Sequence, residues 1–529
     1  MTVAGAANAA QYYFGGYDAT NSVQGTPDAP ATSPFVVSGQ TTFYSDAAGT
    51  SPNAAGTGFV TASDTSAELV LGGGPTAANY IASTPSSTGT VAIRGIALTS
   101  TNPGQNTLNL GFTSGGRYSI ASGGSGLFGV GITLNGTSDW LIANGGAANS
   151  PIRLQNSASI SGSGTGTLTI PFNIANSSGG PSLTVALPNG KLVLSANNDF
   201  GSNSGTAAGQ FTLSSGTVDF QSARPFGVAR NQVRLNGGTL TSSTGTTMST
   251  VYTGTAQTGA QGGILIGGNL TFTGAVNWSL GTSTVNLTGN RTITANTAGT
   301  TGTTIAGVLG DNGGAFGLTV AAASTGKLTL TGANTYTGTT TIAGGTLALG
   351  ANAQAPVFTG AGGADLQGGK LLLDYTGGSS PVASVKSILD LGYAGNFATG
   401  QIKSTTLAAG RTIGYGDNGT DTVTLRITLA GDADLDGDVD FNDFLVLQSK
   451  FGQANTRFDE ANFNYDGFTD FNDFLALQAN FGQSVTGDEV AFTSAQVAAM
   501  TAFASVVPEP ASLTLIGMGA AGLLGRRRR

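Results

Sequence analysis

The sequence predicts a mainly β protein, in which a parallel β-solenoid is followed by a small α-helical unit and an apolar C-terminal segment. Three observations predict this class. Gly accounts for 85 of the 529 residues, and hydrophobic residues reach 39% while charged residues are only 9%. This composition is typical of short strands joined by tight turns, and not of a polar disordered chain. Apolar and polar residues alternate on both sides of Gly-rich turns. An acidic block near the C-terminus is duplicated.

The N-terminal residues 1–11, "MTVAGAANAAQ", end in small residues that are typical of a signal-peptide cleavage region. The basic and apolar regions that precede such a site in exported proteins are missing from this stretch. We interpret it as the remnant of a truncated signal peptide, and a short disordered start is the alternative.

Residues 12–375 show a recurring pattern of alternating apolar residues around Gly-rich turns. The turn glycines recur at a nearly constant spacing, from Gly216 to Gly238 and from Gly345 to Gly369. A regular period of this kind indicates a solenoid whose coils stack about 4.8 Å apart and bury their alternate apolar residues. A β-sandwich array, which also has closely spaced strands, is the alternative. The clearest segments are Phe211–Phe220, Val233–Ser242, Thr340–Gly350 and Ala364–Tyr375.

One segment of this region is more specific. The stretch "GKLTLTGANTYTGTTTIAGGTLALG", residues 326–350, resembles the autotransporter-associated β-strand repeat. The resemblance implies a right-handed parallel β-helix of the kind found in surface-exposed or secreted bacterial proteins. In that family the motif describes the scaffold and not a reaction.

Residues 376–430 predict a capping segment over the end of the solenoid. Helical spacing of apolar residues within Ser380–Gly395 indicates one short helix. The alternating stretch Asp421–Gly431 is typical of an edge strand.

The residue types that are missing exclude several chemistries. The chain has no Cys and no His, which excludes thiol catalysis, Ser-His-Asp triads and thiolate or imidazole metal sites. Residues 1–430 hold 14 acidic and 14 basic side chains, so this neutral body excludes a basic nucleic-acid surface. Residues 431–500 hold 13 acidic and two basic side chains, so the acidic charge is local. Any bound metal should be a hard cation held by oxygen.

The acidic block contains two copies of one stretch, Asp436–Gln453 and Asp466–Gln483, which match at most of their positions. Together with the four residues before it, each copy places oxygen-bearing residues at positions 1, 3, 5, 9 and 12 of a calcium-type loop, with Gly at position 6. We therefore expect two Ca²⁺ sites, the second weaker because its position 1 is a neutral Asn. In loop 1 (Asp432–Asp443) the candidate ligands are Asp432, Asp434, Asp436, the carbonyl of Asp438, Asp440 and Asp443. In loop 2 (Asn462–Asp473) they are Asn462, Asn464, Asp466, the carbonyl of Phe468, Asp470 and Asp473.

Each loop leads into a predicted helix that ends at a glycine, Gly452 in the first copy. Helical spacing predicts that its buried face is formed by Phe441, Phe444, Leu445, Gln448 and Phe451. A full EF-hand would also need a helix before the loop, and the sequence ahead of loop 1 is typical of a strand.

Two loop–helix units in tandem resemble the dockerin domain, over residues 431–483, which we call the paired-loop module. The resemblance implies two calcium ions and a cohesin-like protein partner. It also implies partner contacts at loop positions 10 and 11, which here are Phe441, Asn442, Phe471 and Asn472.

A linker is expected over residues 484–505, followed by an apolar tail, residues 506–529. The tail resembles the PEP-CTERM sorting signal through its triad, an apolar helix and a terminal Arg cluster. The resemblance implies an exosortase, and a Gram-negative-type bacterium that exports the protein after a transient inner-membrane anchor. The uncharged stretch Ala511–Gly525 predicts a short transmembrane helix of about 22 Å. The sorting residues are Pro508, Glu509, Pro510, Arg526, Arg527, Arg528 and Arg529.

These features together predict a non-catalytic, exported β-solenoid of the cell surface or extracellular matrix that docks to a partner when calcium is present. A surface-docked glycoside hydrolase or polysaccharide lyase is the alternative, although the body shows no compelling carboxylate cluster. A glycan-binding adhesin is a weaker alternative, and extracellular polysaccharide is then the expected ligand. No catalytic residue is assigned.

Overall fold

The computed structural model divides the chain into two compact units, each described by itself. The first unit comprises residues 1–318 and 325–337, and the second comprises residues 319–324 and 338–529. The structure describes residues 11–13, 35–37, 64–71, 79–83, 90–98, 101, 105–111, 117–120, 131–144, 152–154, 157–176, 182–198, 210–222, 232–243, 263–275, 277–486 and 493–506.

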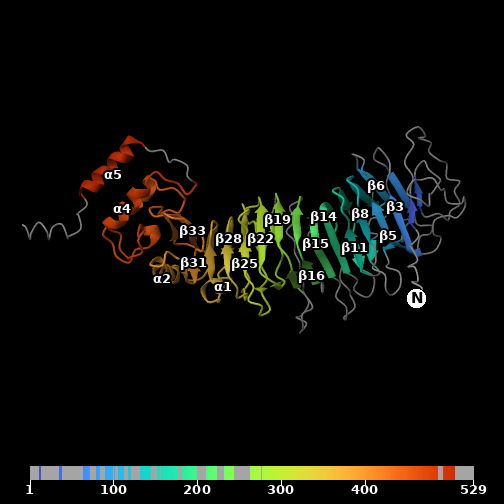
Figure 1. Ribbon diagram of the computed structural model, residues 1–529, viewed down its shortest axis with the longest axis horizontal. Coiled ribbons are helices and arrows are strands. Elements are labelled where there is room, and N and C mark those ends of the chain that lie inside the picture. Colours follow the sequence, from blue (N-terminus) through green and yellow to red (C-terminus); the bar gives the residue numbers. More distant parts are fainter. Residues whose placement is uncertain are drawn as a thin grey trace, which may run out of the picture. The chain divides into compact units, whose positions relative to one another are not determined.

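The first unit is a β-solenoid whose strands stack on the strands one coil away (Figure 1). Its strands are β1 (Gln11–Tyr13), β2 (Phe35–Val37), β3 (Asp64–Leu71), β4 (Asn79–Ser83), β5 (Thr90–Leu98), β6 (Asn106–Gly111), β7 (Arg117–Ile120), β8 (Ile132–Leu134), β9 (Trp140–Asn144), β10 (Ile152–Leu154), β11 (Ala158–Ser161), β12 (Thr167–Ile170), β13 (Ile174–Asn176), β14 (Ser182–Leu194), β15 (Gln210–Phe220), β16 (Gln232–Leu235), β17 (Gly238–Ser242), β18 (Gly263–Ile266), β19 (Leu270–Gly274), β20 (Trp278–Ser279), β21 (Val285–Leu287), β22 (Arg291–Thr297), β23 (Thr303–Ile305), β24 (Leu309–Gly310) and β26 (Lys327–Leu330). β25 (Leu318–Val320) contains the division between the units.

Register confirms parallel stacking, but the coil length is not constant, since Val233 lies opposite Ile264 and Ile96 opposite Ile132. Thr217 of β15 lies opposite Thr239 of β17, a separation equal to that of the turn glycines Gly216 and Gly238. The described strand pairs of this unit run parallel, with β2–β4 as the antiparallel exception. Parallel pairing excludes the β-sandwich array, since that architecture is built from antiparallel sheets. The right-handed sense that the resemblance implies stays a prediction.

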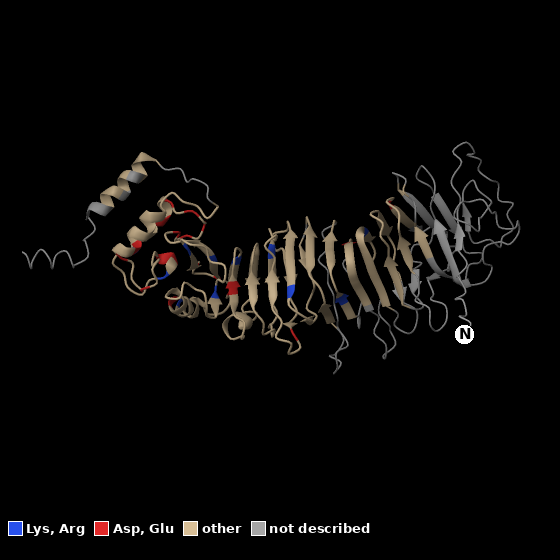
Figure 2. Ribbon diagram, in the orientation of Figure 1, with Lys and Arg blue, Asp and Glu red and all other residues tan. Residues whose placement is uncertain are grey.

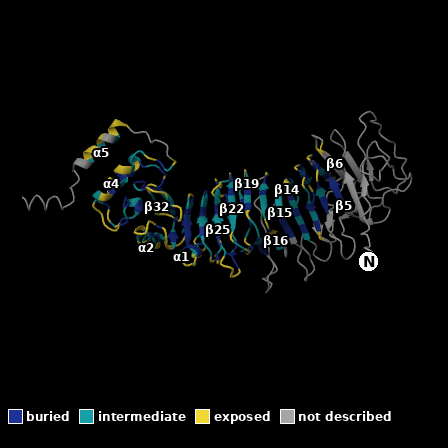
Figure 3. Ribbon diagram, viewed as in Figure 1, coloured by how far each residue is buried: buried dark blue, intermediate teal, exposed yellow. Residues whose placement is uncertain are grey.

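In many of the strands whose burial the structure describes, alternation of small polar and apolar residues places one side of the strand in the solenoid core (Figure 3). In β12, Leu168 and Ile170 are fully buried while the two threonines are half-buried. Gly216 shows why the corners need glycine. Its φ is 92°, and a Cβ there would lie 2.0 Å from the carbonyl oxygen of Leu187 on the next coil.

Buried and half-buried polar side chains also join neighbouring coils. The Asp311 carboxylate accepts hydrogen bonds from the backbone nitrogen and the hydroxyl of Thr337, both at 2.8 Å. Asn277 accepts bonds from the backbone nitrogens of Thr301 and Gly302. These side chains satisfy backbone donors at the turns, where no strand ladder is available.

The second unit contains β27 (Thr340–Ile342), β28 (Thr346–Leu349), β29 (Ala364–Leu366), β30 (Lys370–Asp374), β31 (Ile402–Lys403), β32 (Arg411–Asp417), β33 (Thr422–Leu429), α1 (Ala355–Phe358), α2 (Val382–Tyr393), α3 (Phe441–Lys450), the 3₁₀ turn η1 (Phe458–Glu460), α4 (Phe471–Asn480) and α5 (Ser494–Val506). The parallel stacking continues from β27 to β29 and from β28 to β30, where Thr340 lies opposite Ala364 and Thr346 opposite Lys370. The helix predicted near residues 380–395 is confirmed by α2.

The strand predicted within Asp421–Gly431 is confirmed by β33, but its expected place at the edge of the sheet is wrong. β33 lies between β30 and β32 and pairs antiparallel with both. The outer strand is β32, whose two internal glycines weaken the alternation that marks a strand in the sequence. This antiparallel hairpin ends the parallel stacking in the second unit.

The expected linker also differs from the structure, because residues 494–506 form α5. Thr493 precedes this helix, and its hydroxyl accepts a bond from the Gln496 nitrogen while the Gln496 side chain accepts a bond from the Thr493 nitrogen. This Thr-x-x-Gln capping box was the signal that could have predicted α5.

Two predictions fall outside the described residues, namely the signal-peptide remnant over residues 1–10 and the tail from residue 507 onward. Within the described part of the chain, no helix is long and apolar enough to cross a membrane.

Candidate cation sites in the acidic loops

Loop 1 gathers the first three of its predicted ligands. Carboxylate oxygens of Asp432, Asp434 and Asp436 lie within 4.8 Å of one another. Left-handed backbone at Leu435, with a φ of 62°, and at Gly437, with a φ of 109°, curls the chain so that alternate side chains converge. The predicted role of the glycine at position 6 is therefore confirmed as a backbone requirement.

Asp432 provides the test of whether this loop fits a cation. Its side chain is fully buried, and its Oδ2 accepts bonds from the Thr428 hydroxyl and from the Gly437 nitrogen, the latter at 3.1 Å. Its Oδ1 is buried without a hydrogen-bond partner. Burial raises the pKa of Asp432 to about 6, and the nearby carboxylates of Asp436 and Asp434 contribute to the rise. A buried, unpaired carboxylate oxygen beside two other carboxylates fits a hard cation.

Positions 9 and 12 of loop 1 have another role in this structure. Asp440 is the N-cap of α3 and accepts a bond from the Asn442 nitrogen at 2.7 Å. Asp443 completes the capping box, because its Oδ2 accepts from the Asp440 nitrogen and its Oδ1 from the Ala433 nitrogen, each at 2.7 Å. Burial raises the pKa of Asp443 to about 8. The structure thus gathers positions 1, 3 and 5, and places positions 9 and 12 at the start of the helix.

Loop 2 repeats this arrangement with fewer charges. Asn462 is buried, and its Nδ2 donates to the Thr456 carbonyl at 3.1 Å, which leaves its Oδ1 buried without a partner. The Asn464 amide donates to Asp466 at 2.9 Å. Asp470 and Asp473 form the capping box of α4, and burial raises the pKa of Asp473 to about 6. The equivalent atom, Oδ1 of position 1, is therefore unpaired in both loops.

The segment around position 7 of each loop pairs with the chain that follows the helix of the other copy. In loop 1, Val439 donates to the Gln483 carbonyl and accepts from the Gly482 nitrogen, both at 2.9 Å. In loop 2, Thr469 donates to Gln453 at 3.0 Å and accepts from Gly452 at 2.8 Å. Each loop is therefore closed by the other copy.

In each loop, this pairing with the other copy turns the predicted carbonyl ligand at position 7 away from the paired segment. Asp438 and Phe468 each lie between two residues whose backbones bond to the other copy. The backbone nitrogens of Asp438 and Phe468 instead donate to the side chains of Asp436 and Asp466 within their own loops, both at 2.8 Å. In an antiparallel strand pair the N–H and the C=O of one residue point to the same side of the strand. The carbonyls of Asp438 and Phe468 therefore face their own loops, as their N–H groups do.

The predicted helix face is wrong in part. Phe444 and Leu447 are buried, but Gln448 is exposed and Leu445 is 45% exposed. Leu475, the equivalent residue of α4, is also 45% exposed. Helical spacing predicts a buried Leu445 because a helix turns about 100° per residue and Leu445 borders the buried stripe.

The four predicted partner contacts lie at the surface or its margin. Asn442 and Asn472 are exposed, and Phe441 and Phe471 are half-buried. Asn442 and Leu445 lie three positions apart on α3, as Asn472 and Leu475 do on α4, so each helix has one exposed asparagine and one exposed leucine on the same face.

Phe503 of α5 contacts residues from both copies. Its ring centroid lies 5.3 Å from that of Phe444, 5.4 Å from that of Phe451 and 5.8 Å from that of Phe474. Phe444 and Phe474 occupy the same position in their copies, so one ring packs against the equivalent side chains of α3 and α4. The sequence analysis missed this contact because it did not assign α5.

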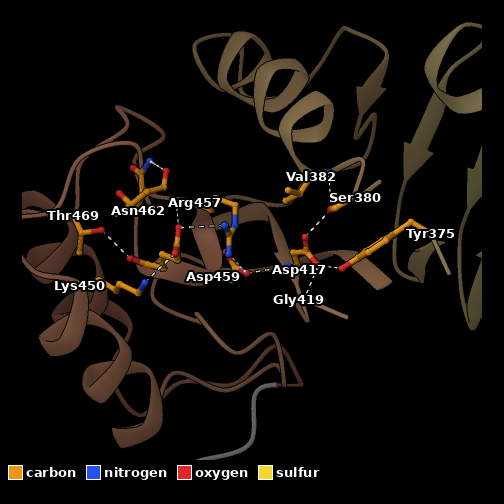
Figure 4. Close-up of polar contacts among 12 residues, drawn as sticks. Tyr375, Ser380, Val382, Asp417, Gly419, Lys450, Arg457, Asp459, Asn462 and Thr469 are labelled. Atoms are coloured by element: carbon orange, nitrogen blue, oxygen red, sulfur yellow. Dashed lines mark hydrogen bonds and ion pairs between the residues drawn. The ribbon is translucent and has the colours of Figure 1, made fainter. Parts of the chain in front are cut away.

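Polar contacts join loop 2 to the capping strands (Figure 4). Asp459 accepts from the Asp417 nitrogen at 2.8 Å and pairs with Arg457 at 2.9 Å. Asp417 in turn accepts from the hydroxyls of Tyr375 and Ser380, both at 2.6 Å. Although burial opposes the change, these hydroxyl bonds hold the pKa of Asp417 below its usual value. Because η1 leads directly into loop 2, these contacts fix the start of that loop.

Charge concentrates in this part of the second unit, while most of the described solenoid ribbon carries none (Figure 2). Arg426 of β33 approaches loop 1, where its Nη1 donates to the Leu435 carbonyl at 2.7 Å. Lys370 lies opposite Arg426 in the sheet. Burial lowers the pKa of Lys370, and the charge of Arg426 contributes. A basic pair beside loop 1 partly offsets the repulsion among its carboxylates.

The fold and the loops define a repeat protein, a β-solenoid with an acidic paired-loop module in its second unit. Comparison with known proteins supports the repeat and the tail. Residues 323–349 match the Passenger-associated-transport-repeat family, which confirms the predicted repeat. Residues 506–529 match the PEP-CTERM protein-sorting motif, which confirms the predicted sorting signal. This motif indicates export to the surface of a Gram-negative bacterium and is consistent with processing by an exosortase. No curated protein and no solved structure matches the chain.

Proposed function

We propose that this exported β-solenoid protein is non-catalytic and attaches to a protein partner through its paired-loop module when the module holds Ca²⁺. The observation on which this rests is the convergence of three carboxylates around a buried, unpaired oxygen of Asp432. Asp432, Asp434, Asp436 and the carbonyl of Asp438 would hold the first ion. Asn462, Asn464, Asp466 and the carbonyl of Phe468 would hold the second. The ion would neutralise loop carboxylates that otherwise repel one another.

The four position-9 and position-12 aspartates contribute differently. Since Asp440, Asp443, Asp470 and Asp473 cap α3 and α4, they transmit the order of each loop to the helix that follows it. A cation that orders the loop therefore favours the helix, because metal binding free energy adds to folding free energy.

The partner surface is the exposed side of α3 and α4. It comprises the predicted contacts Asn442 and Asn472 together with the exposed leucines at position 14, Leu445 and Leu475. Two equivalent leucines with the same exposure favour a partner that contacts the two copies in related ways. The chemistry suits a cohesin-like protein with an apolar surface rimmed by hydrogen-bonding groups.

Buried carboxylates of the repeat region support a structural role for the solenoid. Asp219 pairs with Lys191 at 2.8 Å, Asp311 bonds to Thr337, and Asp365 accepts from the Thr405 hydroxyl at 2.7 Å. Each of these carboxylates is used to join neighbouring parts of the chain, whereas hydrolysis of a polysaccharide needs a pair of carboxylates that flank the substrate.

Isothermal titration calorimetry of the full chain with CaCl₂ tests this proposal. Two sites are expected in the wild type. Asp432→Asn, which keeps the shape of the side chain but removes its charge, should weaken the first site on the order of tenfold, because it gives loop 1 the neutral position 1 that loop 2 already has. Asp438→Asn is the matched control, because only the carbonyl of residue 438 is a proposed ligand, and it should keep the two sites of the wild type. A wild-type titration without binding heat, together with unchanged helix content by circular dichroism, would refute cation binding.

A further inference from the structure

α5 has a defined binding surface on the paired-loop module, formed by rings from both copies. Phe503 contacts Phe444, Phe451 and Phe474 at ring-centroid distances between 5.3 and 5.8 Å. Phe444 and Phe474 are almost fully buried. The contacts with Phe444 and Phe451 are edge-to-face and that with Phe474 is tilted, and such packing favours one orientation of the helix over others.

An isolated helix of this length is not stable in water. α5 has 13 residues, and helices shorter than about 12–15 residues are marginal on their own. Its persistence as a helix therefore depends on contacts with the rest of the chain, and the three rings around Phe503 provide them.

The loops control the surface on which α5 packs. Phe451 directly precedes Gly452, whose nitrogen donates to Thr469 of loop 2, and the Gly482 nitrogen after α4 donates to Val439 of loop 1. The ends of both helices are thereby fixed by the loop of the opposite copy. If a cation orders the loops, it also brings the phenylalanines of α3 and α4 to the positions that Phe503 requires.

The C-terminal end of α5 coincides with the start of the sorting segment. α5 ends at Val506, and the sorting match covers residues 506–529. Pro508 follows Phe503 by five positions, which span at most about 18 Å even when fully extended. A docked Phe503 therefore keeps the start of the sorting segment close to the folded module.

We propose that α5 is an intramolecular ligand of the paired-loop module and that its docking depends on the cation, so that the occupied module holds the start of the sorting segment. This inference rests on the proposed cation binding. Its surface differs from the proposed partner surface, because Leu445 and Leu475 stay exposed while Phe503 packs on the neighbouring phenylalanines. α5 and a protein partner can therefore occupy the module together.

Hydrogen–deuterium exchange of the full chain, in excess CaCl₂ or in EGTA, tests the inference. In Ca²⁺ the amides of residues 494–506 should exchange at least tenfold more slowly than in EGTA. Phe503→Ala should remove this protection in Ca²⁺ while α3 and α4 stay protected. Leu391→Ala is the control, since the Leu391 side chain is 84% exposed on α2 and Leu391 belongs to neither loop; it should behave as the wild type.

Two outcomes distinguish the proposals. If α3 and α4 gain protection in Ca²⁺ but α5 exchanges equally in the wild type and in Phe503→Ala, the docking of α5 is refuted and cation binding stands. If the protection of α3, α4 and α5 is the same in Ca²⁺ and in EGTA, cation binding and the cation dependence of docking are both refuted.

Discussion

The hydroxyl of Tyr465, at position 4 of loop 2, donates a hydrogen bond to the backbone carbonyl of Ile413 in β32. The ring stacks on Tyr393 of α2 at 4.9 Å and meets Phe397 edge-on at 5.4 Å. A residue of the loop is therefore part of the core of the capping segment. Loop 2 and the antiparallel strands that end the solenoid consequently stabilise each other.

Tyr465→Phe tests this shared core. Removal of the hydroxyl leaves the Ile413 carbonyl without its partner, so β32 and loop 2 should lose about 1–2 kcal/mol of stability together. Hydrogen exchange resolved by peptide measures the effect in both segments. Tyr393→Phe is the control, because Tyr393 is partly exposed and the loss of its hydroxyl should lower stability less. A loss of protection confined to loop 2, with β32 unchanged, would show that the two segments do not stabilise each other.

Asn462→Asp should strengthen the second proposed cation site. Asn462 occupies the position that Asp432 occupies in loop 1, and its Oδ1 is already buried and unpaired. A charged ligand at this position should raise Ca²⁺ affinity on the order of tenfold, because affinity follows the ligand charge count. Calorimetry should then show two sites of similar affinity. A mutant that binds as the wild type does would show that residue 462 is not a ligand.

The module without Ca²⁺ should be more stable in mild acid than at pH 8. The pKa values of Asp432 and Asp473 are about 6 and that of Asp443 about 8, all raised mainly by burial from 3.8. A raised folded-state pKa means that the folded state binds protons more tightly, so stability is lost as the pH rises through 6 and 8. Helix content in EGTA should fall over this range.

Addition of Ca²⁺ should oppose that trend, because Asp432 is a proposed ligand and the ion competes with the proton for its carboxylate, so that Ca²⁺ affinity should rise as the pH passes about 6. Circular dichroism at matched pH values, with and without EGTA, measures both effects. Helix content that rises with pH in EGTA would contradict the pKa directions.

Leu445→Asp and Leu475→Asp should affect partner binding and not folding. Both leucines are partly exposed, so each change should alter stability by no more than about 0.5 kcal/mol. If the two copies offer equivalent contacts, either single mutant should keep part of the partner binding and the double mutant should lose it. A Ca²⁺-dependent pull-down from the envelope of the source bacterium measures this. Full recovery of the partner by the double mutant would place the partner surface elsewhere.

The sequence predicted those features whose signal lies within a short stretch of the chain. The spacing of Gly216 and Gly238 predicted the length of the coil from β15 to β17, although other coils are longer. The positions of Asp432, Asp434 and Asp436 predicted their convergence, because alternate residues of a curled loop point to one side. The capping roles of the aspartates at positions 9 and 12 were missed although the Asp-x-x-Asp spacing was visible, since the same spacing belongs to the loop pattern.

Other features depend on residues far apart in the sequence and could not be predicted from it. The bond from Tyr465 to Ile413 joins a loop to a strand that precedes it by 52 residues. The contact of Phe503 with Phe444 joins segments whose relation is set only by the packing of the whole module. The exposure of Leu445 follows from which neighbours cover α3, and helical spacing alone does not give that information.

The bonds of Val439 to Gly482 and Gln483, and of Thr469 to Gly452 and Gln453, are related by exchange of the two copies. Two separate chains, each with one copy, could make the same bonds across a twofold axis. The module thus has the geometry of a homodimer joined into a single polypeptide. Fusion removes the concentration dependence of such an association, and after duplication each half is free to diverge, as the Asp432 and Asn462 positions have done.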